Sequence, residues 1–145
     1  MWTAEVALAC ALELLGRSPS TLPPITVVEA APSFVSPRAE AFVLEGDPHI
    51  YVIGTSPLVE RLRRSPAPCG DFDSTRKLAS VLVHEETHLT HGPNEDTAYR
   101  AQLTTLAALG AGAGTPLYDS VSRARREVLT RPRVVLTATE NRGKR

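Results

Sequence analysis

Two histidines and one glutamate in this chain have the spacing of a metal site that a single helix can build. They form the pattern His-Glu-x-x-His at His84, Glu85 and His88. Positions four apart lie one above the other on a helix, so both imidazoles can reach one ion from the same face. Glu85 lies beside that face, where its carboxylate can take a proton from a metal-bound water. The spacing therefore predicts a metal-activated hydrolytic site.

The segment around these residues has the pattern of an amphipathic helix. Residues 74–90 carry an apolar stripe at helical spacing, formed by Leu78, Val81, Leu82 and Leu89. Ser74 is the expected N-cap, since its hydroxyl can accept from a free backbone N–H of the first turn. Gly92 and Pro93 end the helix, because glycine tolerates a left-handed turn and proline cannot continue the hydrogen-bond ladder. His84, Glu85 and His88 therefore fall in the C-terminal half of the predicted helix.

A catalytic zinc ion usually has three protein ligands and one open position for water, so a third ligand is needed. Asn94 has the pattern of the N-cap of a new helix, residues 95–109, which begins with Glu95 and Asp96. The reversal before this helix brings an acidic residue close to the two histidines. Position alone leaves both carboxylates as candidates.

Together, His84, Glu85, His88 and Glu95 resemble the site of the zincin peptidases. Within that superfamily the match is to the small gluzincins, in which a glutamate from a following helix is the third ligand. That glutamate often stands in a Glu-x-x-Ala context, as at residues 95–98 here, which favours Glu95 over Asp96. The resemblance covers residues 75–99. It implies one Zn²⁺ per chain held by His84, His88 and Glu95, with Glu85 as general base.

Other polar residues near the motif have candidate roles. Tyr99, one turn after Glu95, and Tyr118 are the available phenols for stabilising an oxyanion; core packing is favoured for both, and Tyr99 is the better functional candidate. His91 is expected to cap the helix end, although an oxyanion contact or an additional ligand role is also open. Carboxylates could fix the imidazole tautomers, and the candidates are Asp71, Asp73 and Asp96.

The segments that precede the motif predict a small sheet. Residues 25–28, 40–45 and 49–53 are short and rich in β-branched or aromatic side chains. The turn at residues 46–48 joins the last two at hairpin length, so they are expected to pair antiparallel. In zincins an edge strand above the motif helix pairs with an extended peptide, and the resemblance assigns that role to residues 49–53.

The expected fold class is α+β and zincin-like. It comprises an N-terminal helix, a small mostly antiparallel sheet, the His-Glu-x-x-His helix, the glutamate helix and a C-terminal helix. Besides the two site helices, helical patterns cover residues 1–16, 57–64 and 116–130.

The length of 145 residues indicates a single domain. Residues 1–130 are expected to form one minimal catalytic domain. Residues 131–145 are expected to be a partly disordered tail with one β-like run at residues 133–136.

Charge and hydropathy limit the partners. Sixteen basic and sixteen acidic side chains give a net charge of zero, which indicates neither nucleic acid nor a membrane surface as partner. The N-terminal segment lacks a basic leader and carries Glu5 and Glu13, so an amphipathic helix is expected instead of a signal peptide. No apolar run approaches the roughly 18 residues of a membrane span. A cytoplasmic location is expected, and the oligomeric state is not indicated.

Cys10 and Cys69 are the only cysteines. Cys10 falls on the N-terminal helix and Cys69 in a Pro- and Gly-containing loop, residues 65–70. Two separate thiols are expected, with a disulfide as the less favoured alternative. Since no C-x-x-C pair is present, a metal site must use histidine and carboxylate ligands.

The combined pattern predicts a zinc metallopeptidase that acts on peptide or protein substrates. Two alternatives remain. The domain could be a zincin-like binding or regulatory module with little or no activity, or it could hydrolyse a non-peptide amide with the same site.

Overall fold

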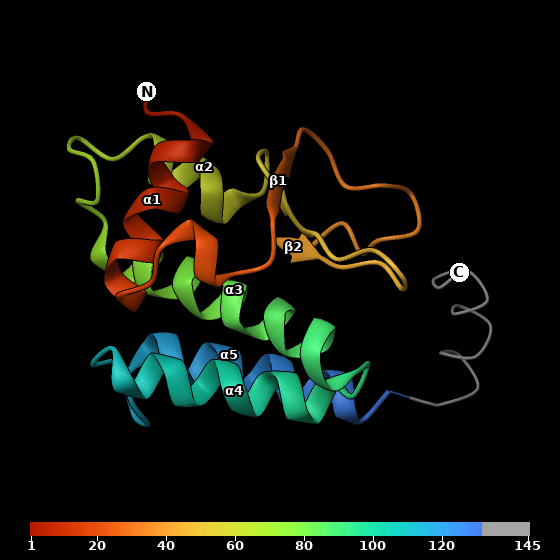
Figure 1. Ribbon diagram of the computed structural model, residues 1–145. Helices are drawn as coiled ribbons and strands as arrows, with labels where there is room; N and C mark the ends of the chain where they lie inside the picture. The colour runs from red at the N-terminus through yellow and green to blue at the C-terminus, as the bar shows by residue number, and fades with distance from the viewer. Residues whose placement is uncertain (132–145) are drawn as a thin grey trace.

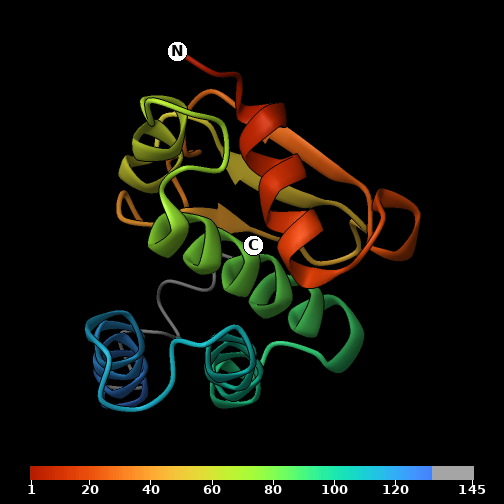
Figure 2. The ribbon, with the colours of Figure 1, turned by 90° about the vertical axis from the view of Figure 1, so that its left-hand side faces the viewer.

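A long central helix organises the molecule. The computed structural model describes residues 1–131, and within this range α3 (Phe72–His91) carries the motif. On one side of α3 lie α1 (Ala4–Leu15) and the sheet, and on the other side lie α4 (Glu95–Ala108) and α5 (Pro116–Leu129) (Figures 1 and 2). α3 therefore lies between a layer formed by α1 and the sheet and a layer formed by α4 and α5.

The sheet is mixed, not mostly antiparallel as predicted. Its strands are β1 (Ile25–Val28), β2 (Ala41–Phe42) and β3 (Ile50–Ile53), in the order β1-β3-β2. β3 pairs antiparallel with β2, which confirms the hairpin, but it also pairs parallel with β1. The reason is that β2 follows β1 in sequence but pairs with the edge of β3 opposite to the one that pairs with β1. The class α+β is confirmed.

β2 is shorter than the predicted segment 40–45. The backbone N–H of Asp47 donates to the carbonyl of Leu44 at 3.1 Å, so the hairpin turn already begins there. Residues after Phe42 therefore leave the sheet, and the strand keeps only the two residues that pair with β3.

The helix boundaries follow their caps. α3 begins at Phe72 because Asp71 is the N-cap and its carboxylate accepts from the backbone N–H of Ser74 at 3.0 Å, so the predicted N-cap Ser74 is wrong by one turn. Gly92 has a φ of +97°, which few other residues adopt, and Asn94 caps α4 as predicted. α2 (Pro57–Arg63) and α5 match their predicted ranges to within a residue. A short 3₁₀ helix, Pro19–Thr21, follows α1.

The main apolar core lies between α1, α2, the sheet and one face of α3. Its fully buried members include Ile50, Val52, Leu78 and Leu82. A second, smaller cluster joins α4 to α5, and it consists of Leu103, Leu106, Ala111 and Val121. The two clusters fix α3 and α4 independently, so the site between these helices has rigid support on both sides.

Cys10 and Cys69 form a disulfide, which overturns the prediction of two separate thiols. α1 packs against both α2 and α3, and this brings Cys10 next to the loop between them. The residues are 59 apart in sequence, so their proximity depends on tertiary packing and leaves no local pattern.

No helix among residues 1–131 is both long and apolar enough to span a bilayer. The β-like run predicted at residues 133–136, and all of the predicted tail except Arg131, lie outside the described residues.

Candidate metal centre

Three predicted ligands converge where α3 meets α4. The Nε2 atoms of His84 and His88 each lie 3.2 Å from the same oxygen of Glu95, Oε1. One donor atom from each residue falls within 4.8 Å of the other two. These side chains could hold a metal ion.

The tight reversal between the helices makes this convergence possible. Gly92 ends α3 and α4 begins only a few residues later, with Asn94 accepting from the backbone N–H of Thr97 at 3.0 Å. Ala98 is fully buried, so α4 can approach α3 closely at this point. Glu95 therefore lies in the first turn of α4, directly after the turn that reverses the chain, and close to His88.

Asp96 points away from the cluster. Its carboxylate pairs with Arg125 of α5 at 2.6 Å and with Arg100 at 3.2 Å. Glu95 is thus the acidic residue of this helix that reaches the histidines, as the Glu-x-x-Ala context predicted.

The two motif glutamates also point in different directions. Glu86 accepts two hydrogen bonds from the guanidinium of Arg17, both 2.8 Å long, and anchors α3 to the segment after α1. Glu85 is buried and lines the cavity beside the cluster, and within residues 1–131 its carboxylate has no hydrogen-bond partner. Burial raises the pKa of Glu85, against the opposing influence of His84 and His88. A buried carboxylate with a raised pKa is suited to accept and return a proton.

The outer ring nitrogens of both histidines have partners. Nδ1 of His88 lies 3.0 Å from the backbone carbonyl of Gly92, and Nδ1 of His84 lies 2.8 Å from Oε1 of Gln102. A carbonyl only accepts, so Nδ1 of His88 is the donor and its Nε2 faces Glu95. Such partners orient ligating imidazoles.

The prediction that Asp71, Asp73 or Asp96 orients the histidine rings is wrong. Asp71 caps α3 and Asp73 pairs with Arg76 at 3.3 Å, while Asp96 pairs with arginines. Gln102 was missed. A sequence signal was available, because Gln102 follows Glu95 by seven residues and therefore lies two turns along the same face of α4.

His88 and Glu95 form an ion pair within the cluster. Burial lowers the pKa of His88, but its hydrogen bond to Glu95 and the charge of that carboxylate outweigh this and raise it to about 9. Burial likewise raises the pKa of Glu95, but hydrogen bonds to His84 and His88 lower it to about 2. Glu95 is therefore ionised at neutral pH and ready to act as an anionic ligand.

Tyr99 lies against the cluster, whereas Tyr118 and His91 do not. The ring of Tyr99 meets that of His84 edge to face, with 4.6 Å between centroids, and it lines the same cavity. Burial, with the charge of Glu95, raises the pKa of Tyr99 to about 12. Tyr118 packs against the α4/α5 cluster, as its core alternative predicted. His91 is exposed and its Nδ1 contacts the hydroxyl of Thr90 at 2.8 Å, so its ring does not cap the helix end as predicted.

A cavity of about 490 Å³ opens at the cluster. α3, α4, α5 and residues 36–41 line it. α5 contributes an apolar wall, formed by Val121, Ala124 and Val128. Ala41 of β2 lines the cavity as well, so the open edge of the sheet borders the site. The prediction that residues 49–53 form this edge is wrong, because β3 is the central strand.

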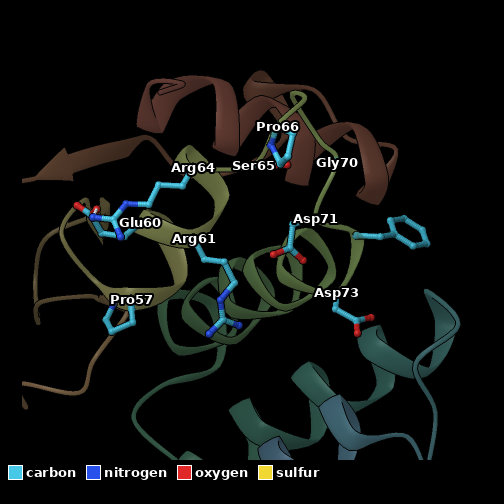
Figure 3. Close-up of a pocket in the computed structure, with 10 residues that line it drawn as sticks. Pro57, Glu60, Arg61, Arg64, Ser65, Pro66, Gly70, Asp71 and Asp73 are labelled. Carbon is cyan, nitrogen blue, oxygen red and sulfur yellow. Dashed lines mark ion pairs between the residues drawn. The ribbon is translucent and has the colours of Figure 1, made fainter.

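A larger cavity, about 920 Å³, lies elsewhere (Figure 3). It is lined by α2, the loop that follows, and the start of α3. Phe72 in its wall is twelve residues before His84, or about 18 Å along the helix axis. Its charged groups are largely engaged locally, since Glu60 pairs with Arg64 at 3.3 Å and Asp71 caps α3. It contains none of the converging ligands.

No protein-family model, curated protein or solved structure matches this chain. The functional assignment therefore rests on the geometry of the site.

Proposed function

We propose that this protein is a zinc-dependent hydrolase, a small metallopeptidase of zincin-like type. The observation that supports this most is the convergence of His84, His88 and Glu95 beside Glu85, a buried residue with no hydrogen-bond partner among residues 1–131, at a cavity. A structural metal site has no need of such a base, and structural zinc sites usually have four protein ligands.

The donor set fits zinc. Two imidazole nitrogens and one carboxylate oxygen form a common ligand set of catalytic zinc. The orienting contacts of Gln102 and Gly92 leave both Nε2 atoms facing the third ligand, as ion binding requires. A bound Zn²⁺ would supply a water of near-neutral pKa and polarise the substrate carbonyl.

The chain's own residues would move the protons. Glu85 takes the proton from the attacking water and returns it to the leaving nitrogen, which is why its raised pKa matters. Tyr99 keeps its proton at neutral pH because its pKa is about 12, so it can donate a hydrogen bond to the carbonyl oxygen as negative charge develops.

The open edge of β2 offers a backbone template for an extended peptide. Ile53 donates its N–H to the carbonyl of Glu40 at 3.0 Å, so Glu40, directly before β2, takes a hydrogen-bonded position opposite Ile53 that continues the β2/β3 register. Antiparallel pairs alternate, and the next residue, Ala41, therefore directs its N–H and carbonyl away from β3. These groups can pair with a substrate strand along the cavity.

The apolar wall of α5 suggests which side chains the cavity accepts. Ala124 and Val128 are only partly buried and line the cavity beside the ligands. An apolar side chain next to the scissile bond would cover them and be stabilised by burial.

The disulfide bears on location. Such bonds persist in oxidising compartments and are rare in the cytosol. The Cys10–Cys69 bond therefore counts against the cytoplasmic location predicted from the sequence.

Digestion of a mixed peptide library by the zinc-loaded protein, with products identified by mass spectrometry, tests the proposal. We expect cleavage next to apolar residues, abolished by a chelator and restored by zinc. The matched control is Glu85→Gln, which removes the base and no ligand. Zinc binding without cleavage of any peptide would favour a binding module, and cleavage of non-peptide amides alone would change the substrate class.

A further inference from the structure

We propose that Gln102 is a positioning residue that sets the tautomer of His84 through a directed chain of hydrogen bonds. The chain runs from the backbone carbonyl of Lys77 through Ser80 and Gln102 to Nδ1 of His84. This inference rests on the metal-binding part of the proposed function and not on peptide hydrolysis.

The direction of the chain is fixed at its first link. The hydroxyl of Ser80 lies 2.8 Å from the carbonyl of Lys77, and since a carbonyl cannot donate, Ser80 gives its single proton to it. The oxygen of Ser80 is then free to accept, and Nε2 of Gln102 donates to it at 3.2 Å.

The amide orientation of Gln102 determines the next link. With its NH₂ group toward Ser80, Gln102 presents Oε1 to His84, where the separation is 2.8 Å. An oxygen acceptor requires a proton on Nδ1 of His84. A neutral ring then has its lone pair on Nε2, the nitrogen that can bind a metal beside Glu95 and His88, whereas a ring that is also protonated on Nε2 donates to Oε1 of Glu95 at 3.2 Å.

Burial makes this order selective. Ser80 is fully buried, and Gln102 and His84 are 5% and 8% exposed, so water does not readily replace a lost partner. The reversed chain would turn the NH₂ group toward His84 and leave the proton on Nε2, directed at the ligand cluster. In that order the hydroxyl of Ser80 would donate to Oε1 of Gln102 and give up its hydrogen bond to the carbonyl of Lys77. The orientation of the Gln102 amide thus decides whether Nε2 of the neutral His84 ring is free to bind a metal or must first lose a proton.

His84 and His88 differ in this respect. Nδ1 of His88 is held by the backbone carbonyl of Gly92, which no substitution removes. His84 is therefore the ligand whose orientation depends on a replaceable side chain, and the effect can be isolated by mutation.

The test uses the full chain and Zn²⁺ alone, with affinity measured by competition with a chelator. Gln102→Met removes the acceptor with little change in volume, and we expect a loss of about 10- to 100-fold in affinity. Gln102→Glu keeps an acceptor toward Nδ1 and should bind nearly as well as the original chain. Ser80→Ala, which frees the amide to rotate, should fall between them. The control is Thr104→Ala, at an exposed position of α4.

A second readout is independent of both metal and substrate. ¹H–¹⁵N spectra of the metal-free protein should show a proton on Nδ1 of His84 in the original chain and in Gln102→Glu, whether or not Nε2 also donates to Glu95, but not in Gln102→Met. An unchanged tautomer and affinity in Gln102→Met would overturn the proposal. A loss in Gln102→Glu equal to that in Gln102→Met would also overturn it, since the amide would then act as donor to His84. If the original chain bound no zinc, the spectra would still report the tautomer, which separates failure of the proposed function from failure of this inference.

Discussion

Glu85 differs from its neighbours in having no partner within residues 1–131 while being buried beside the ligand cluster. We expect Glu85→Gln to keep zinc affinity, because it removes no ligand, and to lower kcat by about 10²- to 10⁴-fold, the usual contribution of a general base. Peptide turnover and zinc content measured on the same preparation check both parts. Unchanged turnover in this variant would contradict the assigned base.

The His88–Glu95 pair predicts a pH dependence of the metal-free protein. The pKa of His88 is raised from 6.5 to about 9, so its protonated form stabilises the fold fully below 6.5, and this stabilisation is lost as the pH rises through about 9. The pKa of Glu95 is lowered from 4.5 to about 2, so its contribution is present above 4.5 and is lost as the pH falls through about 2.

We therefore expect the free energy of unfolding of the metal-free protein to fall between pH 6 and 9 relative to that of His88→Gln, which cannot titrate there. Zinc should reverse the trend, because it binds the deprotonated imidazole. Urea unfolding at several pH values, with and without zinc, measures both effects. Parallel pH profiles for the two metal-free proteins would show that the pair does not form.

At the residue level, the sequence predicted which side chains converge, His84, His88 and Glu95, but not the partners that orient the histidines. His84, Glu85 and His88 are related by helical spacing, which is local, and Glu95 follows after one short reversal. The seven-residue spacing places Gln102 on the Glu95 face of α4, but its contact with His84 depends on how that face packs on α3. The acidic residues chosen instead already have local partners, since Asp71 serves its own helix as cap.

At the level of elements, local patterns predicted which segments form helices and strands, but not how strands are ordered. The hairpin follows from a short turn, whereas the position of β1 depends on its connection to β2, residues 29–40, crossing to the far side of β3. The substrate edge was therefore assigned to β3, although β3 is the central strand and β2 lies at an edge of the sheet. The caps show a similar limit, because both Asp71 and Ser74 are good N-cap residues and only the path of the loop decides between them.

The assignment of β2 as the substrate edge predicts the effect of one substitution. Ala41→Pro removes an N–H that points away from the β2/β3 ladder, so the sheet should tolerate it while peptide pairing weakens. We expect a higher KM for peptides and unchanged zinc affinity. Ala41→Ser, which keeps the N–H, is the control. Equal KM values for the two variants would remove β2 from substrate binding.

The molecule as a whole is built on α3, whose two halves have different tasks. The N-terminal half packs in the main core and lies near the disulfide, and the C-terminal half carries His84 and His88 of the candidate metal cluster. Length and composition predicted a single compact domain. The Cys10–Cys69 bond could not be predicted, because it joins residues that only the packing of α1 brings together.

The disulfide should stabilise the fold without affecting the site. Closing a loop with a separation of 59 residues is worth about 4 kcal/mol in the chain-entropy model. We expect the double variant Cys10→Ser, Cys69→Ser to lose up to about that free energy of unfolding in urea, and to keep zinc affinity. The original chain with and without reductant is the comparison. Equal stability, or free thiols in the unreduced protein, would mean that the bond is not formed.

The stoichiometry of bound zinc tests the central claim most directly, and elemental analysis of the full chain after equilibration with zinc and removal of the excess measures it. We predict one Zn²⁺ per chain, lost in Glu95→Ala and retained in Asp96→Ala, since Asp96 pairs with Arg125 and Arg100 instead. A chain that binds no zinc, or one in which Asp96→Ala loses the ion while Glu95→Ala keeps it, would contradict the metal centre described above.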